Sequence, residues 1–411
     1  MSWGYRGGAG DLTTVAAITP PPSPPVHPRL AIGATFQVHR NSLNFLRLVL
    51  ALAVVFSHAI TIGLFGSENF LGKTTLGTLA VYGFFGISGY LIAGSAERNH
   101  VGRYLWQRVL RIFPAFWTCM FVTAFVFGTV VWYHANPLLA SRCGVSCYLS
   151  EPGGPVGYFL RNLWIQAPQS TIAHTLPLGY FRPVWNGSVW TLYFECMCYV
   201  LLAVLSVAGL LRHRLAVALL AATIWLTEIV ITSVPQFNQH FSPSDNWDAM
   251  KLLTFVPVFL GGSLLYLYRD RVPDSGLLAL ACALAFLSGL VLPLGNSTPA
   301  FTLTSTDLTS VFLAYPLLWL GIHLPLHQVG ARNDYSYGVY IYAFPVQQLL
   351  VNWGANRWGY WPYAFLSVAA VAPVAAASWW VVERHALRLK TVRWPLPTRL
   401  GQRASEDPRL E

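Results

Sequence analysis

About ten apolar runs, each close to twenty residues long, limit what this chain can fold into. A helix of roughly 20 residues is what crosses the ~30 Å hydrocarbon core of a bilayer. Because backbone polar groups in lipid must be satisfied inside the segment, each run is predicted to be a helix. The runs are 44–65, 76–96, 112–133, 186–209, 214–234, 251–268, 276–295, 307–324, 335–354 and 361–382.

The composition excludes a set of soluble domains, although 411 residues could form two or three of them. Hydrophobic residues make up 55% of the chain and charged residues only 10%. Most of the apolar runs also lack the polar face of a surface helix. The prediction is therefore one all-α, polytopic membrane bundle over residues 42–390. Residues 1–41 are Pro-rich and predicted to be a disordered tail, and residues 391–411 a short basic tail.

Lys and Arg are distributed unevenly between the two sides of this bundle. With the N-terminus inside, 19 of them fall in inner segments and six in outer ones, while Arg47 lies within the first run. This bias predicts that both termini are cytoplasmic and that residues 134–185 form the longest outer segment. The formal charge of +10 then reflects topology and attraction to anionic lipid, so no nucleic-acid partner is expected. An N-terminal signal peptide is not expected either, because the first apolar run begins only after residue 42.

Two of the six cysteines, Cys143 and Cys147, lie in the predicted outer segment. An oxidising compartment permits a disulfide between them. A zinc site is the weaker alternative, because two cysteines at this spacing with no clear His pair give little support to it. No metal is expected.

His58 and Glu195 are ionisable residues inside strongly apolar runs. A charged side chain near the bilayer centre costs roughly 2.5–3.5 kcal/mol on insertion scales, which makes both functional candidates. At 1.5 Å per residue, His58 is roughly 21 Å from the inner start of its span and Glu195 roughly 13 Å from the outer start of its own. Both fall in the outer half, as does Glu228. An imidazole tuned by a carboxylate is a usual general base. A polar pair that holds helices together and a transporter's proton relay are the alternatives.

Arg108 and Arg111 lie in the segment that joins the second and third runs, RNHVGRYLWQRVLRIFPAFW. Residues three apart share a helix face, and paired guanidinium groups suit phosphate oxygens. Anchoring of the helix at the cytoplasmic boundary is the alternative.

Six motifs, in order and over about residues 42–390, resemble those of the membrane-bound acyltransferase 3 family. The first two resemble its opening helices, and the third its RxxR segment followed by Pro. The fourth resembles a tryptophan-to-glutamate motif, which usually has Ser where Thr191 stands. The last two resemble its late helices. They read FLRLVLALAVVFSH, YGFFGISGYLIAGS, QRVLRIFPAFW, SVWTLYFE, YSYGVYIYAFPV and VVERHALRL.

This resemblance implies transfer of an acyl group, commonly acetyl, from acyl-CoA to a hydroxyl of a surface or exported carbohydrate. It implies His58 and Glu195 as catalytic residues, and a cell-membrane location of the bacterial inner-membrane type. The donor, which is a substrate rather than a bound cofactor, is expected to contact Arg47, Ser88, Arg108 and Arg111.

Two positions depart from the family's pattern. Asn44 and Phe45 replace its Asp-Gly, and Ala343 replaces a late His. A transporter or flippase for lipid-linked sugars is the alternative function, although no inverted repeat supports it. A non-catalytic partner of a polysaccharide assembly complex is a third, and it would leave the His–Glu and RxxR residues without a use.

Overall fold

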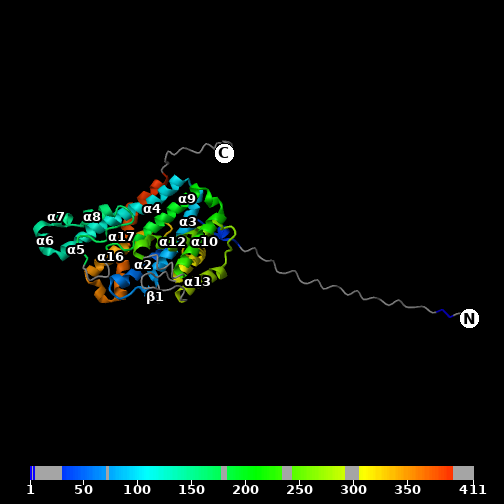
Figure 1. Cartoon of the computed structure of the whole chain (residues 1–411). Helices are drawn as coiled ribbons and strands as arrows, with labels where there is room; N and C mark the ends of the chain where they lie inside the picture. The colour runs from blue at the N-terminus through cyan, green and yellow to red at the C-terminus, as the bar shows by residue number, and fades with distance from the viewer. Residues whose placement is uncertain are drawn as a thin grey trace, which may run out of the picture.

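The computed structural model describes residues 1, 3–4, 30–70, 74–176, 183–233, 243–291 and 305–391. In these ranges the chain is a bundle of packed helices, which confirms the predicted fold class (Figure 1). The strands of the described residues are β1 (Asn69–Phe70) and β2 (Thr74–Thr75), which pair antiparallel at one end of the bundle.

Within the described ranges, seven helices are long and apolar enough to cross a bilayer, so the chain is a multi-pass membrane protein. Five are α2 (Leu43–Ile62), α3 (Leu76–Arg98), α9 (Trp190–Val207), α10 (Arg214–Ser233) and α12 (Pro243–Leu267). The other two are compound helices, Val101–Ala135 and Tyr360–Arg388.

The remaining three predicted runs form shorter helices. These are α13 (Gly276–Val291), α15 (Ala314–His323) and α16 (Ser336–Asn352). Before α15 come α14 (Ser305–Thr309) and the 3₁₀ turn η3 (Ser310–Leu313). Other 3₁₀ turns are η2 (Leu210–Arg212), η4 (Ala355–Trp358) and η6 (Leu389–Thr391).

A π-turn interrupts each compound helix. The first runs through α4 (Val101–Val122), η1 (Thr123–Phe127) and α5 (Gly128–Ala135). The second runs through α17 (Tyr360–Ser378), η5 (Trp379–Glu383) and α18 (Arg384–Arg388). Such turns often mark functional sites because they change the direction of the side chains that follow them. Here η5 ends at Glu383, which is buried.

Glycines allow α3 and α12 to cross at very short range. A Cβ added to Gly89 would lie 2.0 Å from the carbonyl oxygen of Phe259, and one added to Gly262 would lie 2.1 Å from that of Gly86. Small residues permit this backbone approach between membrane helices. Gly86 and Gly89 therefore serve helix packing.

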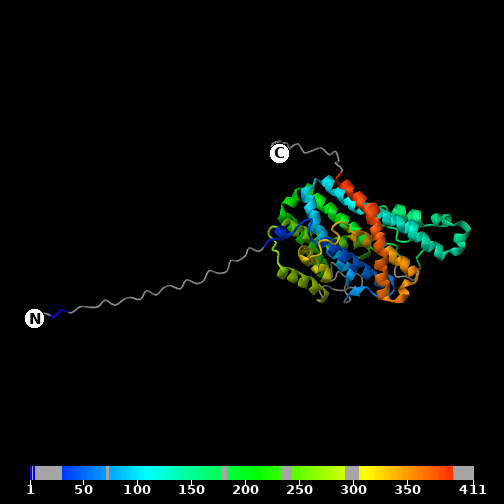
Figure 2. The same cartoon turned by 180° about the vertical axis from the view of Figure 1, so that it is seen from behind.

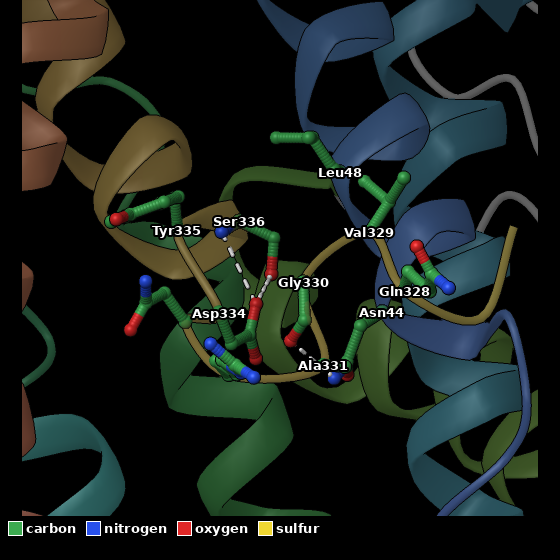
Figure 3. A pocket seen from close by; sticks show the side chains of 11 residues that line it. Asn44, Leu48, Gln328, Val329, Gly330, Ala331, Asp334, Tyr335 and Ser336 are labelled. Carbon is green, nitrogen blue, oxygen red and sulfur yellow. Dashed lines mark hydrogen bonds between the residues drawn. The ribbon is translucent and has the colours of Figure 1, made fainter.

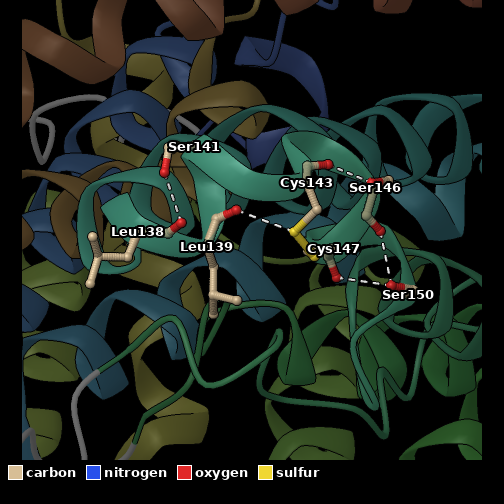
Figure 4. Close-up of a disulfide and its surroundings, with 7 residues drawn as sticks. All are labelled: Leu138, Leu139, Ser141, Cys143, Ser146, Cys147 and Ser150. Atoms are coloured by element: carbon tan, nitrogen blue, oxygen red, sulfur yellow. Dashed lines mark hydrogen bonds between the residues drawn. A yellow bond between two sulfur atoms is a disulfide. The ribbon is translucent and has the colours of Figure 1, made fainter.

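After α5 the chain leaves the bundle as a set of short helices. They are α6 (Pro137–Cys143), α7 (Val145–Ser150) and α8 (Pro155–Arg161), which project from one side (Figure 1, Figure 2). A disulfide joins Cys143 at the end of α6 to Cys147 in α7, as Figure 4 shows. The disulfide interpretation of these two cysteines agrees with the structure.

The described part of the N-terminal tail contacts the bundle. The short helix α1 (Ile32–Thr35) places Ile32 in a fully buried position, and the Ile32 N–H donates to the Val272 carbonyl at 2.9 Å. Residues 2, 5–29 and 392–411, which hold most of the two predicted tails, lie outside the described residues.

Candidate functional site

Five of the six predicted site residues line one cavity of about 340 Å³. Arg47 comes from α2, Ser88 from α3, Arg108 and Arg111 from α4, and Glu195 from α9. Residues from four distant helices thus meet at one place. This cavity, named here the basic cavity, also includes Tyr199, Asp334, Tyr337 and Lys390.

Asp334 holds two of the arginines in ion pairs. Its Oδ2 accepts from Arg47 at 2.9 Å and also from Arg111, whose other terminal nitrogen lies 3.7 Å from Glu383. Burial alone would raise the pKa of Asp334, but Arg47 and Arg111 hold it well below its usual range. Asp334 therefore supplies the acidic contact to Arg47 that the motif at 44–45 lacks.

The loop before α16 forms the edge of the basic cavity and one wall of a neighbouring cavity of about 650 Å³. Asn44 donates a hydrogen bond from Nδ2 to the Gly330 carbonyl at 2.9 Å, and Asp334 accepts from Ser336 (Figure 3). The Asn at position 44 thus ties this loop to the start of α2.

Arg108 differs from Arg111 because it makes no ion pair with any described residue. Its Nε is buried without a hydrogen-bond partner. The guanidinium group lies 6.0 and 5.9 Å from the ring centroids of Tyr104 and Tyr199. A buried cation with an unused donor is suited to an anionic ligand. The sequence predicts the same role for the two arginines. In the structure Arg111 pairs with carboxylates, whereas Arg108 has no carboxylate partner among the described residues.

Lys390 is a further cation in the basic cavity that the sequence had not singled out. Burial, with the nearby charges of Arg111 and Arg108, lowers its pKa to about 8. Its only sequence signal was its place at the end of the region 42–390, among six other cations from 384 to 409.

Ser88 and Glu195 meet inside the basic cavity. Ser88 Oγ donates to Glu195 Oε1 at 3.3 Å, and the Tyr199 hydroxyl donates to the same oxygen. Glu195 Oε2 has no hydrogen bond to a described residue, so it can accept one from a ligand.

His58 lies apart from these residues, in a cavity of about 570 Å³ named here the His58 cavity. Its Nδ1 is 3.6 Å from Glu68 Oε1, and its ring packs edge-on against Phe344. Ser57 Oγ donates to Glu68 at 2.9 Å, and Thr61 also donates to it. Sequence reasoning missed Glu68, which follows the first apolar run by three residues and is brought back to His58 by a turn.

The structure does not bring His58 and Glu195 together. Each lines its own cavity, and no hydrogen bond or ion pair joins these two described residues. Helical rise gave the height of each residue but not the direction of its side chain. In addition, α9 begins at Trp190 rather than near residue 186. Glu228, the other candidate partner, is buried near Asp307 and Thr254 and lines neither cavity.

The two cavities lie toward opposite ends of four helices, α2, α3, α9 and α16. On α2, Arg47 lines the basic cavity and His58 lines the other one. Eleven residues of helix separate them, or about 16 Å. Residues at or near the start of α3 and α9, and in α16, also line the His58 cavity: Thr75, Trp190 and Phe344.

Comparisons with known proteins identify the family of this chain. Residues 40–380 match the model of the acyltransferase 3 family, described as an acyltransferase domain. The O-acetyl transferase of Shigella phage Sf6 is 30% identical over 356 residues, which cover 84% of this chain and 96% of the relative. Nodulation protein 10 of Rhizobium leguminosarum bv. viciae is 27% identical over 373 residues, which cover 86% and 95%. No solved structure matches the chain. With a family match over most of its length, this chain belongs to the acyltransferase 3 family and is a membrane acyltransferase.

Proposed function

We propose that this protein transfers a short acyl group, acetyl first among them, from acyl-CoA to a hydroxyl of a surface or exported carbohydrate. Exopolysaccharide, O-antigen and a lipid-linked sugar precursor are the acceptor classes. The observation that carries the proposal is the pair of cavities on one set of helices. One holds cations, and the other holds an imidazole beside a carboxylate.

The donor would bind in the basic cavity, which the distribution of Lys and Arg predicts to be cytoplasmic. Arg108 and Lys390 would contact the nucleotide phosphates, because they are the cavity's partly buried cations outside the Asp334 ion pairs, whereas Arg332 is exposed. Glu195 Oε2 would accept an amide N–H of the donor's arm, while Ser88 and Tyr199 hold its Oε1.

The acceptor hydroxyl would enter the His58 cavity. His58 would take the hydroxyl proton as the oxygen attacks the thioester carbonyl. The new C–O bond forms, the C–S bond breaks, and the departing thiolate takes the proton from the imidazolium. Glu68 would orient the ring and stabilise the imidazolium, the role that a carboxylate plays in hydrolase triads.

This proposal changes one role that the sequence predicted. Glu195 becomes a donor-binding residue, and Glu68 becomes the carboxylate that supports the general base. The change follows from the contacts of His58 with Glu68 and of Glu195 with Ser88.

Mass spectrometry of surface polysaccharide from cells with and without the gene tests the acceptor class. The expected result is an acyl mass increment that disappears with the gene and returns with the wild-type copy. Purified protein in liposomes with isotope-labelled acetyl-CoA tests the donor, since the label should appear in the acceptor. Unchanged polysaccharide in the deletion strain would contradict the proposal.

A further inference from the structure

Between the two cavities lies a layer of three side chains that line neither. On α9, residues at steps of three and four share a face. Glu195 and Tyr199 on that face line the basic cavity, and Val189 and Trp190 near the helix start line the His58 cavity. Thr191 is on the same face, one turn from Glu195, and is buried at 5% exposure.

α16 shows the same arrangement around Tyr340. Tyr337 lines the basic cavity and Phe344 the His58 cavity, and Tyr340 lies between them on the same face. The Tyr340 hydroxyl donates to the Ser188 carbonyl at 2.9 Å and forms a second hydrogen bond with Thr191 Oγ1. The hydroxyl is thus fixed against the start of α9.

On α3 the corresponding residue is Phe84, one turn before Ser88. Its ring packs edge-on against Tyr340 with centroids 5.7 Å apart. Phe84, Thr191 and Tyr340, called here the middle layer, therefore contact one another from three helices, between the residues that line the two cavities.

Hydrogen bonds between hydroxyl groups of neighbouring membrane helices can serve only to hold the helices together. The position of this layer indicates a second role, in the path of a ligand. Polar groups inside a membrane bundle mark ligand paths, and here they continue from Ser88 and Glu195 through Thr191 and Tyr340 to the His58 cavity.

We propose that the middle layer is the constriction through which the acyl end of the donor reaches His58, and that it restricts transfer to unbranched acyl groups. This rests on the proposed function, since it takes acyl-CoA as the donor. The donor's phosphates would stay near Arg108 while its thioester reaches His58, so its thin arm must pass the layer. An unbranched acyl chain is no wider than this arm, whereas a branched one is wider. The His58 cavity, at about 570 Å³, has room for branched acyl groups. The restriction would therefore come from the ring of Tyr340 against Phe84.

The test measures transfer from acetyl-, isobutyryl- and pivaloyl-CoA by membranes that contain the wild type, Tyr340→Leu or Phe84→Leu. One methylene changes selectivity roughly 10- to 200-fold in a tight apolar site. Both variants should raise the isobutyryl-to-acetyl rate ratio at least about tenfold. Thr191→Val, which keeps the shape but releases the Tyr340 hydroxyl, should raise it by a smaller factor.

The matched control is Tyr342→Leu. Tyr342 is on the same helix and is 1% exposed, but it lines neither cavity and is outside the middle layer. It should leave the ratio unchanged, although it removes an equally buried ring. Affinity for acetyl-CoA should stay within about twofold in Phe84→Leu, because the phosphate contacts are untouched.

An unchanged ratio in Tyr340→Leu and Phe84→Leu, with normal protein level and acetyl transfer, would overturn the constriction but leave the proposed function intact. If Tyr340→Leu does not accumulate, Phe84→Leu and Thr191→Val decide by the same ratio. Absence of transfer from every acyl-CoA by the wild type would instead remove the proposed function, and the constriction with it.

Discussion

The Nδ1 of His58 lies 3.6 Å from Oε1 of Glu68, ten residues further along the chain and beyond the end of the same helix. Ser57 and Thr61 donate to that carboxylate, so its position is fixed by the helix that carries His58. A carboxylate at Nδ1 leaves Nε2 as the ring nitrogen that can take a proton from a substrate.

Glu68→Gln should lower acyl transfer without loss of protein. The amide keeps the shape but cannot stabilise an imidazolium, and general-base catalysis is typically worth about 10²–10⁴-fold. His58→Ala should remove that contribution entirely. Rates are measured with labelled acetyl-CoA in membranes matched for protein level. Glu97→Gln is the control, because Glu97 pairs with Arg269 and lines neither cavity. Wild-type rates in both Glu68→Gln and His58→Ala would show that this pair takes no part in acyl transfer.

Arg108 and Arg111 should respond differently to substitution. Arg108→Ala should weaken acetyl-CoA binding by roughly ten- to a hundredfold, because a charge-assisted hydrogen bond contributes about 1.5–3 kcal/mol. Arg108→Lys should restore this only in part, since ammonium lacks the bidentate fork.

Arg111→Ala should instead lower stability, by roughly 3–5 kcal/mol, because it leaves Asp334 and Glu383 buried without that cation. Donor titration and thermal unfolding of the two purified variants separate these effects. Equal loss of donor affinity with equal stability would show that the arginines act alike.

Donor affinity should fall as the pH rises above about 8. In the free protein Lys390 loses its proton near that value. Bound phosphates favour the charged form, so binding takes up a proton above the free pKa and weakens there. One proton limits the slope to about tenfold per pH unit. Lys390→Arg should flatten the profile between pH 7 and 9, because guanidinium stays protonated. A slope that persists in this variant would assign the effect to another group.

Cys143 and Cys147 report which side of the membrane α6 and α7 face. With residues 134–185 outside, a membrane-impermeant thiol reagent should label both in intact cells after mild reduction and not before it. The double variant Cys143→Ser/Cys147→Ser is the control for labelling at the four remaining cysteines. Labelling that requires lysis would reverse the predicted orientation and exchange the donor and acceptor sides.

Gly89→Ala should lower the amount of folded protein severely. Its added Cβ would lie 2.0 Å from the backbone oxygen of Phe259. A backbone atom, unlike a side chain, cannot relieve this clash by a change of rotamer. Overpacking typically costs about 1–3 kcal/mol. Gly83→Ala is the comparison, because its Cβ would meet the side chain of Leu50, which can change rotamer. Folded protein is measured by size-exclusion chromatography after detergent extraction, and equal yields would contradict the close crossing of α3 and α12.

The helical membrane fold could be predicted from the sequence because the length and apolarity of a span are local properties. The RxxR pair and Ser88 could be located for the same reason, since each is part of a short motif. The carboxylate that pairs with His58 could not be predicted. Helical rise predicts Glu195 at a height similar to that of His58. In the structure the turn after α2 brings Glu68 to His58 instead, and Glu195 lines the basic cavity. Asp334 was missed because its contacts, Arg47 and Arg111, are more than 200 residues away.

The π-turn η5 fixes the direction in which the side chains after it project from the last helix. It inserts one extra residue per turn between Trp379 and Glu383, which rotates everything that follows by about 100° relative to a regular helix. Point substitutions there would change one side chain at a time. Deletion of a single residue would turn Glu383 away from Arg111 and Lys390 away from the basic cavity at once. Homologous chains should therefore tolerate changes of residue type across 379–383 far better than changes of length.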